Sequence, residues 1–317
     1  MKKILKSFCV LAAAIGSMTL SSCVGYVTPD QTKPSYVALE VYSGRILYSS
    51  NANQRRPIGM LTNLVTATVV LDWVRAQNVD LNRVITVPRE AVRWQRTNLL
   101  KLRPGERISL RDALYSALLW DDSVCATTAA FACGQVLDKA APEKAFVSEM
   151  NKLARRLGMT STTFKGSNGA VITQSTARDM ALMGLYALSD PKMMGITSQP
   201  SVTVTIYSPA GNRTVQVNNN NRLLQAAVDG LKVARSYSAG SCLMVTSSRP
   251  SVKRTNPLTG KPGTYGQRLL VVMLGMPDRS SRDQTAAKFL TDGWNAWDRW
   301  LPSNDYKDKT KFIILPN

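Results

Sequence analysis

The stretch Phe146–Gly169, FVSEMNKLARRLGMTSTTFKGSNG, says most about the fold of this chain. Its first half carries apolar residues at the spacing of one helix face, which predicts a helix over 143–157. Working outward, the same spacing predicts further helices at 60–74, 111–120, 123–137, 176–188 and 283–300. In the last of these helices, Trp294, Trp297 and Trp300 recur at three-residue intervals and are expected to pack on a sheet.

Strand patterns lie before and after these helices. The segments 35–41 and 45–49 flank a turn at 43–44, and the alternation over 200–218 is typical of a hairpin. Short apolar strands are expected at 231–234, 241–247 and 269–274. The segment 248–268 is rich in Pro, Gly and basic residues, so we expect a long loop there, either a binding element or a solvated insertion.

The composition is that of a basic globular chain. The 317 residues are 44% apolar and 19% charged, which is ordinary for a folded domain. The formal net charge is +19, or +16 once the three lysines of the first 22 residues are subtracted. Such a charge favours anionic partners. The basic residues are scattered and no nucleic-acid motif is present, so we expect a basic envelope protein and no nucleic-acid partner.

Histidine is absent from the whole chain. A Ser-His-Asp or Cys-His triad is therefore impossible, and so is a zinc site built on imidazole. Any hydrolytic chemistry would need a lysine, a carboxylate or a tyrosine as its base. No metal-ligand spacing is present either, and we expect neither a metal nor a cofactor.

Residues 1–22 have the pattern of an export signal, with a basic start and an apolar core too short to span a bilayer. The following Cys23 completes Leu-Ser-Ser-Cys, which resembles the bacterial lipobox, whose cysteine receives the lipid. The alternative is an ordinary signal peptide with an incidental cysteine. Because Val24 and not Asp follows, the sorting rules of such lipoproteins imply the outer membrane, with the protein facing the periplasm. The expected organisation is a signal peptide at 1–22, a tether at 23–34, one domain at 35–300 and a tail at 301–317.

Three cysteines remain in the expected domain. Cys125 and Cys133 are eight residues apart in a predicted helix, or about 12 Å along its axis, which is too far for a disulfide. Cys242 could pair with one of them, or all three could be buried thiols, which we favour.

Several collinear segments resemble the serine-type D-Ala-D-Ala carboxypeptidases, peptidase family S11, which are the low-molecular-mass penicillin-binding proteins. The matching segments are 43–48, 103–114, 146–169, 175–181, 221–232, 239–243 and 269–275. The resemblance implies an α+β fold of the β-lactamase/transpeptidase type, with an antiparallel sheet flanked by helices and an all-helical subregion. The C-terminal β-domain of many members does not fit into the short tail after Trp300.

The resemblance also implies three catalytic motifs, of which the first is Ser-x-x-Lys at the start of a buried helix. Aligning the segment 57–67 places Met60 at the serine and Asn63 at the lysine, whereas a slip of one residue would place Gly59 and Thr62 there. Neither alignment restores the base, because Lys33 is the only lysine between Lys6 and Lys101. A thioether and an amide cannot act as nucleophile and general base.

The other two motifs are also changed. At Ser-x-Asn, Asp121 takes the place of the serine and Ser123 that of the asparagine. At Lys-Thr-Gly the chain reads Lys232-Val233-Ala234, so only the lysine is kept. Lys232 is expected to bind a substrate carboxylate, with Arg235 as a further positive charge.

We therefore expect a lipoprotein with an inactive carboxypeptidase-like domain, a pseudoenzyme that binds peptidoglycan stem peptides or a protein partner. One alternative is a divergent D-Ala-D-Ala carboxypeptidase in which Asp121 or Asp122 activates Ser123 or Thr62. The other is a scaffold lipoprotein that contacts a membrane or a protein through 248–268.

Overall fold

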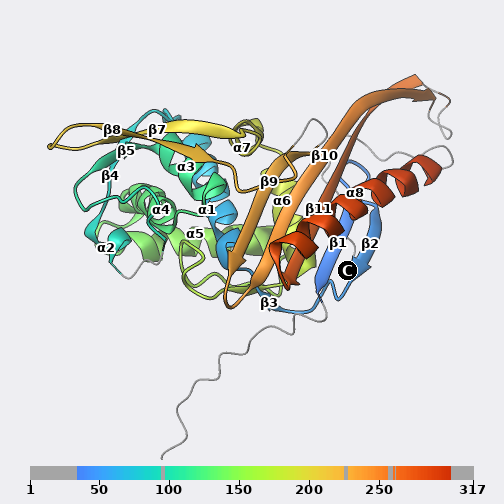
Figure 1. Cartoon of the computed structure of the whole chain (residues 1–317), viewed down its shortest axis with the longest axis horizontal. Helices are drawn as coiled ribbons and strands as arrows, with labels where there is room; N and C mark the ends of the chain where they lie inside the picture. Colours follow the sequence, from blue (N-terminus) through green and yellow to red (C-terminus); the bar gives the residue numbers. More distant parts are fainter. Residues whose placement is uncertain (1–33, 94–96, 225–227, 256–259, 261, 301–317) are drawn as a thin grey trace, which may run out of the picture.

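A five-stranded antiparallel sheet is the centre of the fold in the computed structural model, which describes residues 34–93, 97–224, 228–255, 260 and 262–300 (Figure 1). The strand order is β2-β1-β11-β10-β9. The strands are β1 (Ser35–Glu40), β2 (Ile46–Ser50), β9 (Val228–Ser236), β10 (Gly240–Thr255) and β11 (Pro262–Met276). β9 is thus an edge strand, with one side unpaired in this sheet.

Both faces of this sheet are covered, and the sequence of β11 shows why. Leu270, Val272 and Leu274 belong to the core on one face, whereas Val271 and Met273 belong to the core on the other. All five are fully buried, because successive side chains of a strand point to opposite faces. Helix α6 (Ala177–Ala187) packs on one face of the sheet and α8 (Arg279–Trp300) on the other.

The packing of the α8 tryptophans on the sheet is confirmed for two of the three. Trp294 and Trp297 are buried, and their indole N–H groups donate to Ser247 Oγ at 3.1 Å and to Gln267 Oε1 at 3.2 Å. Each indole ring therefore buries a large apolar surface while its N–H group keeps a hydrogen-bond acceptor. The side chain of Trp300 lies outside the described part.

The helical subregion lies beside the β9 edge of the sheet (Figure 1). Its helices are η1 (Gly59–Leu61), α1 (Thr62–Ala76), α2 (Arg89–Val92), α3 (Leu110–Leu119), α4 (Ser123–Leu137), α5 (Pro142–Arg156) and α7 (Pro191–Thr197). α4 is central: it packs against α1, α3 and α5. The bounds of the long helices agree with the sequence prediction to within a few residues.

The subregion, expected to be all-helical, also carries short strands. A four-stranded sheet has the order β4-β5-β7-β8, and β3 pairs with β6. The strands are β3 (Arg56–Pro57), β4 (Val84–Thr86), β5 (Arg107–Ser109), β6 (Gln174–Ser175), β7 (Ser201–Tyr207) and β8 (Arg213–Asn218). β7 and β8 confirm the hairpin expected over 200–218. β3 and β6 have only two residues each, which is too short for an alternating pattern to reveal them.

The expectation of a long loop at 248–268 is wrong. β10 and β11 continue past the sheet as a two-stranded arm, paired from Ser248↔Arg268 to Thr255↔Pro262 (Figure 1). Pro250, which suggested a loop, lies at a register shift of β10, where a strand tolerates a missing N–H. Tyr265, in the paired arm of β11, is buried and belongs to the hydrophobic core between the sheet and α8.

Cys125, Cys133 and Cys242 are free and buried, as favoured. Burial raises the pKa of the Cys242 thiol to about 11 and that of the Cys125 thiol well above its usual value. None of the helices in the described ranges is long and apolar enough to cross a membrane. The signal peptide, Cys23 and the tail after residue 300 lie outside those ranges.

Candidate active site

Met60 lies in η1, where the chain turns into α1. It is 7% exposed, and its sulfur is 3.6 Å from the hydroxyl oxygen of Ser123. One helical turn later, the amide of Asn63 donates to the carbonyl oxygen of Ala117 at 3.2 Å. The side-chain oxygen Oδ1 of Asn63 is buried and has no hydrogen-bond partner in the described structure. Asn63 therefore faces the end of α3, and Met60 faces the start of α4.

The alternative register, with Gly59 and Thr62 at the motif positions, does not fit this geometry. The Thr62 hydroxyl donates to the carbonyl oxygen of Gly59 at 2.9 Å, and the Ser123 hydroxyl has Thr97 and Met60 as its partners instead. Gly59 itself has a φ of +50°, and a Cβ there would lie 2.8 Å from the hydroxyl oxygen of Ser236 on β9. This glycine is required by the backbone and by the close approach of β9.

A second glycine fixes the position of Met60. A Cβ on Gly169 would lie 2.5 Å from the backbone nitrogen of Met60 and equally close to the carbonyl group of Gly59. Gly169, the last residue of the stretch Phe146–Gly169, thus packs directly on the backbone of η1. Neither glycine carries chemistry, and the packing role of each was not predicted because it depends on contacts distant in sequence.

Ser123 begins α4 and is fully buried. Within the described residues, its hydroxyl oxygen accepts a hydrogen bond from Thr97 and contacts only the Met60 sulfur as a further partner. The Ser123 backbone N–H also donates to the Thr97 hydroxyl, at 3.1 Å. Thr97 belongs to a segment without a periodic pattern, and no signal in the sequence indicated it.

Asp121 and Asp122 are adjacent but have different surroundings. Asp122 caps α4: its carboxylate accepts from the N–H groups of Leu99, Leu100 and Cys125 at 2.6, 3.1 and 2.9 Å. Burial raises the pKa of the Asp122 carboxyl above its usual value, and these hydrogen bonds oppose the shift. Asp121 has a left-handed backbone with φ +66°, which directs its side chain toward β9.

Lys232 on β9 is the residue that Asp121 contacts. Its ammonium group is fully buried and forms an ion pair with Asp121. It also donates to the carbonyl oxygens of Leu118 at 2.7 Å and Val233 at 3.2 Å. An ammonium group has three donors, so all of its hydrogens have acceptors within the chain. The pair joins the edge of the sheet to the segment between α3 and α4.

Arg235 does not join this cluster. It is three residues beyond Lys232 on a strand, so the two side chains point to opposite faces. Arg235 is exposed. Hydrogen bonds from Ser281 are the main cause that lowers the pKa of the Asp278 carboxyl before α8, and the charge of Arg235 contributes less. The expected second charge beside Lys232 is therefore absent from that side of β9.

The cluster brings together Met60, Asn63, Asp121, Ser123 and Lys232 from η1, α1, the α3–α4 segment and β9. A scan against family models matches residues 25–255 to a family described as D-alanyl-D-alanine carboxypeptidase, peptidase S11. The chain belongs to this family.

Curated relatives agree with the S11 assignment. The chain is 26% identical to the D-alanyl-D-alanine carboxypeptidase DacC of Escherichia coli over 86% of its length, and 27% identical to DacD of the same organism over 84%. It covers 64% of the length of each of these relatives. It is also 27% identical to a D-alanyl-D-alanine carboxypeptidase of Streptomyces sp. strain K15, of which it covers 79%.

Solved S11-type structures share the fold. The DD-transpeptidase of Streptomyces K15 superposes with a TM-score of 0.72 at 23% identity, covering 84% of this chain and 99% of that one. Penicillin-binding protein D2 of Listeria monocytogenes, in its ampicillin-bound form, gives 0.65 at 26% identity, covering 83% and 97%. The transpeptidase-like α+β fold implied by the sequence is thereby confirmed.

Proposed function

We propose that this S11 member is a catalytically inactive envelope lipoprotein that binds peptidoglycan stem peptides without cleaving them. The observation that carries the proposal is the contact between Met60 and Ser123. At the position that matches the family's nucleophilic serine, a thioether fills the space and contacts the hydroxyl of the second motif. Acyl transfer needs an oxygen or sulfur nucleophile with a base beside it, and a thioether has no proton to give up.

The groups around Met60 do not supply a substitute. Asn63, at the position of the general base, is an amide whose nitrogen donates to a backbone carbonyl. The ammonium of Lys232 is held by Asp121 and two carbonyl oxygens. Ser123 has no carboxylate or lysine within hydrogen-bond reach in the described part of the chain. The alternative function, a divergent carboxypeptidase with Ser123 as the nucleophile, therefore lacks a general base beside that serine.

Binding is supported by the edge strand. One side of β9 is unpaired in the sheet, and the strand passes η1, with Ser236 close to Gly59. An extended peptide can add to such an edge through backbone hydrogen bonds, which need no catalytic side chain. Carboxylate binding by Lys232 stays a prediction, and it requires the ligand to displace Asp121. Anchoring through Cys23 at the outer membrane, facing the periplasm, would place this edge near the wall.

A short ligand tests this proposal. An N-acetylated tripeptide ending in D-Ala-D-Ala should bind the purified protein in a calorimetric titration, and no D-alanine should be released on prolonged incubation. Ser236→Trp, whose ring has no room against Gly59 and must lie over the edge of β9, should abolish binding, whereas Tyr237→Trp, at the neighbouring 82% exposed position, should not. Release of D-alanine, or equal binding by the Ser236→Trp variant, would contradict the proposal.

A protein partner is a second candidate, and exposed apolar residues favour it. Leu99, Val171, Ile172 and Tyr237 are 45%, 42%, 41% and 82% exposed. The N–H of Leu99 donates to the Asp122 carboxylate. Val171 packs on Gly166, in the same loop as Gly169, which contacts η1. Tyr237 directly follows Ser236 on the chain. A photo-crosslinking residue at position 237 should then capture a protein in cells. The same residue at Val136, which is 62% exposed on α4, is the control.

A further inference from the structure

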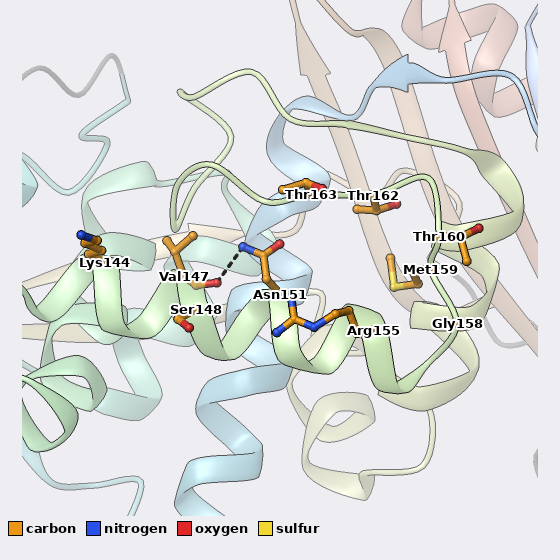
Figure 2. Close-up of a pocket in the computed structure, with 10 residues that line it drawn as sticks. All are labelled: Lys144, Val147, Ser148, Asn151, Arg155, Gly158, Met159, Thr160, Thr162 and Thr163. Carbon is orange, nitrogen blue, oxygen red and sulfur yellow. Dashed lines mark hydrogen bonds between the residues drawn. The ribbon is translucent and has the colours of Figure 1, made fainter.

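A groove lies along the outer face of α5, away from the catalytic-motif positions (Figure 2). One wall is α5 itself, and the other is the segment 158–163, which runs back alongside it. The cavity has a volume of about 610 Å³. Its lining residues are Lys144, Val147, Ser148, Asn151, Arg155, Gly158, Met159, Thr160, Thr162 and Thr163.

The helix wall is a single stripe with a cation at each end. Lys144, Ser148, Asn151 and Arg155 recur at four-, three- and four-residue intervals, which places them on one side of a helix. Phe146 and Met150 lie on the other side and are buried. At 1.5 Å per residue, the backbone positions of Lys144 and Arg155 are about 16 Å apart along the helix axis.

The charge of the groove is uncompensated. None of the ten lining residues is acidic, and neither Lys144 nor Arg155 forms an ion pair within the described residues. The two glutamates of α5 are engaged elsewhere: Glu143 accepts from the Ser167 hydroxyl at 2.7 Å, and Glu149 pairs with Lys152 at 2.7 Å. Two positive side chains on opposite ends of one groove therefore face solvent without a counter-charge.

The walls are held in place by internal hydrogen bonds. The Asn151 amide donates to the carbonyl oxygens of Val147 and Phe164 and accepts from the Phe164 N–H at 2.8 Å. On the facing segment, the buried Thr162 hydroxyl donates to Asp179 at 2.7 Å. The separation of the walls is thus fixed before any ligand arrives, which lowers the entropic cost of binding. The exposed hydroxyls of Ser148, Thr160 and Thr163 complete a polar lining.

We infer that this groove binds an extended peptide with at least two carboxylates, one held near Lys144 and one near Arg155. A span of about 16 Å corresponds to about five residues of extended chain at 3.3 Å each. The partly exposed apolar side chain of Val147, in the middle of the helix wall, suits a peptide better than a bare phosphate polymer. Within the proposed function, on which this assignment rests, the class of ligand is a carboxylate-bearing peptidoglycan stem peptide, bound here at a second site.

A photo-crosslinking stem pentapeptide tests the inference on the purified protein. Mass spectrometry should locate crosslinks between residues 144 and 163. The variant Lys144→Glu/Arg155→Glu should reduce them at least tenfold. The matched control is Lys139→Glu/Lys192→Glu, which changes the net charge equally at two exposed positions outside the groove and should leave the crosslinks unchanged.

Two further arms separate the sources of negative charge. A pentapeptide with amidated carboxyl groups should crosslink at least tenfold less in the groove, and polyphosphate of equal charge should compete less well than the free peptide. Equal crosslinking by the amidated peptide, tighter binding of polyphosphate, or no effect of the groove variant would each overturn the inference. Failure of this inference can be told apart from failure of the proposed function. The proposed function is tested by the tripeptide titration and by D-alanine release, which concern the site beside Ser236 and η1 and not this groove.

Discussion

Lys232 is the residue whose surroundings differ most from its expected role. It was predicted to receive a ligand carboxylate, but a carboxylate of the chain itself, that of Asp121, already occupies it. The two are 111 residues apart in sequence, and no local pattern could have paired them. The left-handed backbone of Asp121 brings the two side chains together, and a sequence read by periodicity does not reveal such a conformation.

Replacing Asp121 by alanine should destabilise the protein by about 3 kcal/mol, because the buried ammonium of Lys232 loses its counter-charge. Urea unfolding followed by circular dichroism measures this loss. The double variant Asp121→Leu/Lys232→Met removes the charge together with its partner, so it should recover most of the stability. Equal stabilities for the wild type and Asp121→Ala would show that the pair contributes nothing.

Asp122 gives a prediction about pH. Burial raises its carboxyl pKa in the folded chain above the unfolded value, so the folded state keeps the proton to a higher pH. Unfolding then releases a proton as the pH rises through this window, and stability falls with increasing pH. Asp122→Asn, which keeps an oxygen to cap α4, should show a shallower fall as the pH rises above the unfolded-state pKa of about 4. Identical slopes in urea titrations across that range would refute the assignment.

At the scale of elements, the long helices and the central strands could be predicted because burial imposes a period on their sequences. The buried face of α5, with Phe146, Met150 and Leu153, shows the helical period, and β11, buried on both faces, reads as a continuous apolar run over 269–274. The arm of β10 and β11 could not be predicted, because beyond the sheet the two strands satisfy each other's backbone groups and need few apolar residues. β3 and β6 were missed because each has only two residues.

The entry into α1 is the element on which the site depends most. Gly59→Ala should cost about 1–3 kcal/mol, since alanine is strained at a φ of +50° and its Cβ would meet Ser236. Gly195→Ala in α7 is the matched control: a Cβ there has open space, and the change should be neutral or stabilising by up to about 1 kcal/mol. Thermal unfolding of both variants measures the difference. A Gly59→Ala variant as stable as Gly195→Ala would mean that η1 does not require glycine.

At the scale of the whole molecule, the S11 scaffold is retained, whereas the residues at the expected motif positions are Met60, Asn63, Asp121, Ser123 and Lys232. The central sheet flanked by helices is the one implied by the resemblance. The structure brings four of the five expected motif positions into two direct contacts, Met60 with Ser123 and Asp121 with Lys232. The sequence predicted which residues stand at these positions. It could not predict that they contact each other, because that depends on glycines and backbone angles around η1.

The central claim is that this scaffold cannot form an acyl-enzyme. Intact-protein mass spectrometry after incubation with ampicillin tests it most directly, with penicillin-binding protein D2 of Listeria monocytogenes, known in an ampicillin-bound form, as the positive control. We predict that the mass of this protein stays unchanged while the control gains one ampicillin. A gain of one ampicillin that disappears in the Ser123→Ala variant would contradict the account.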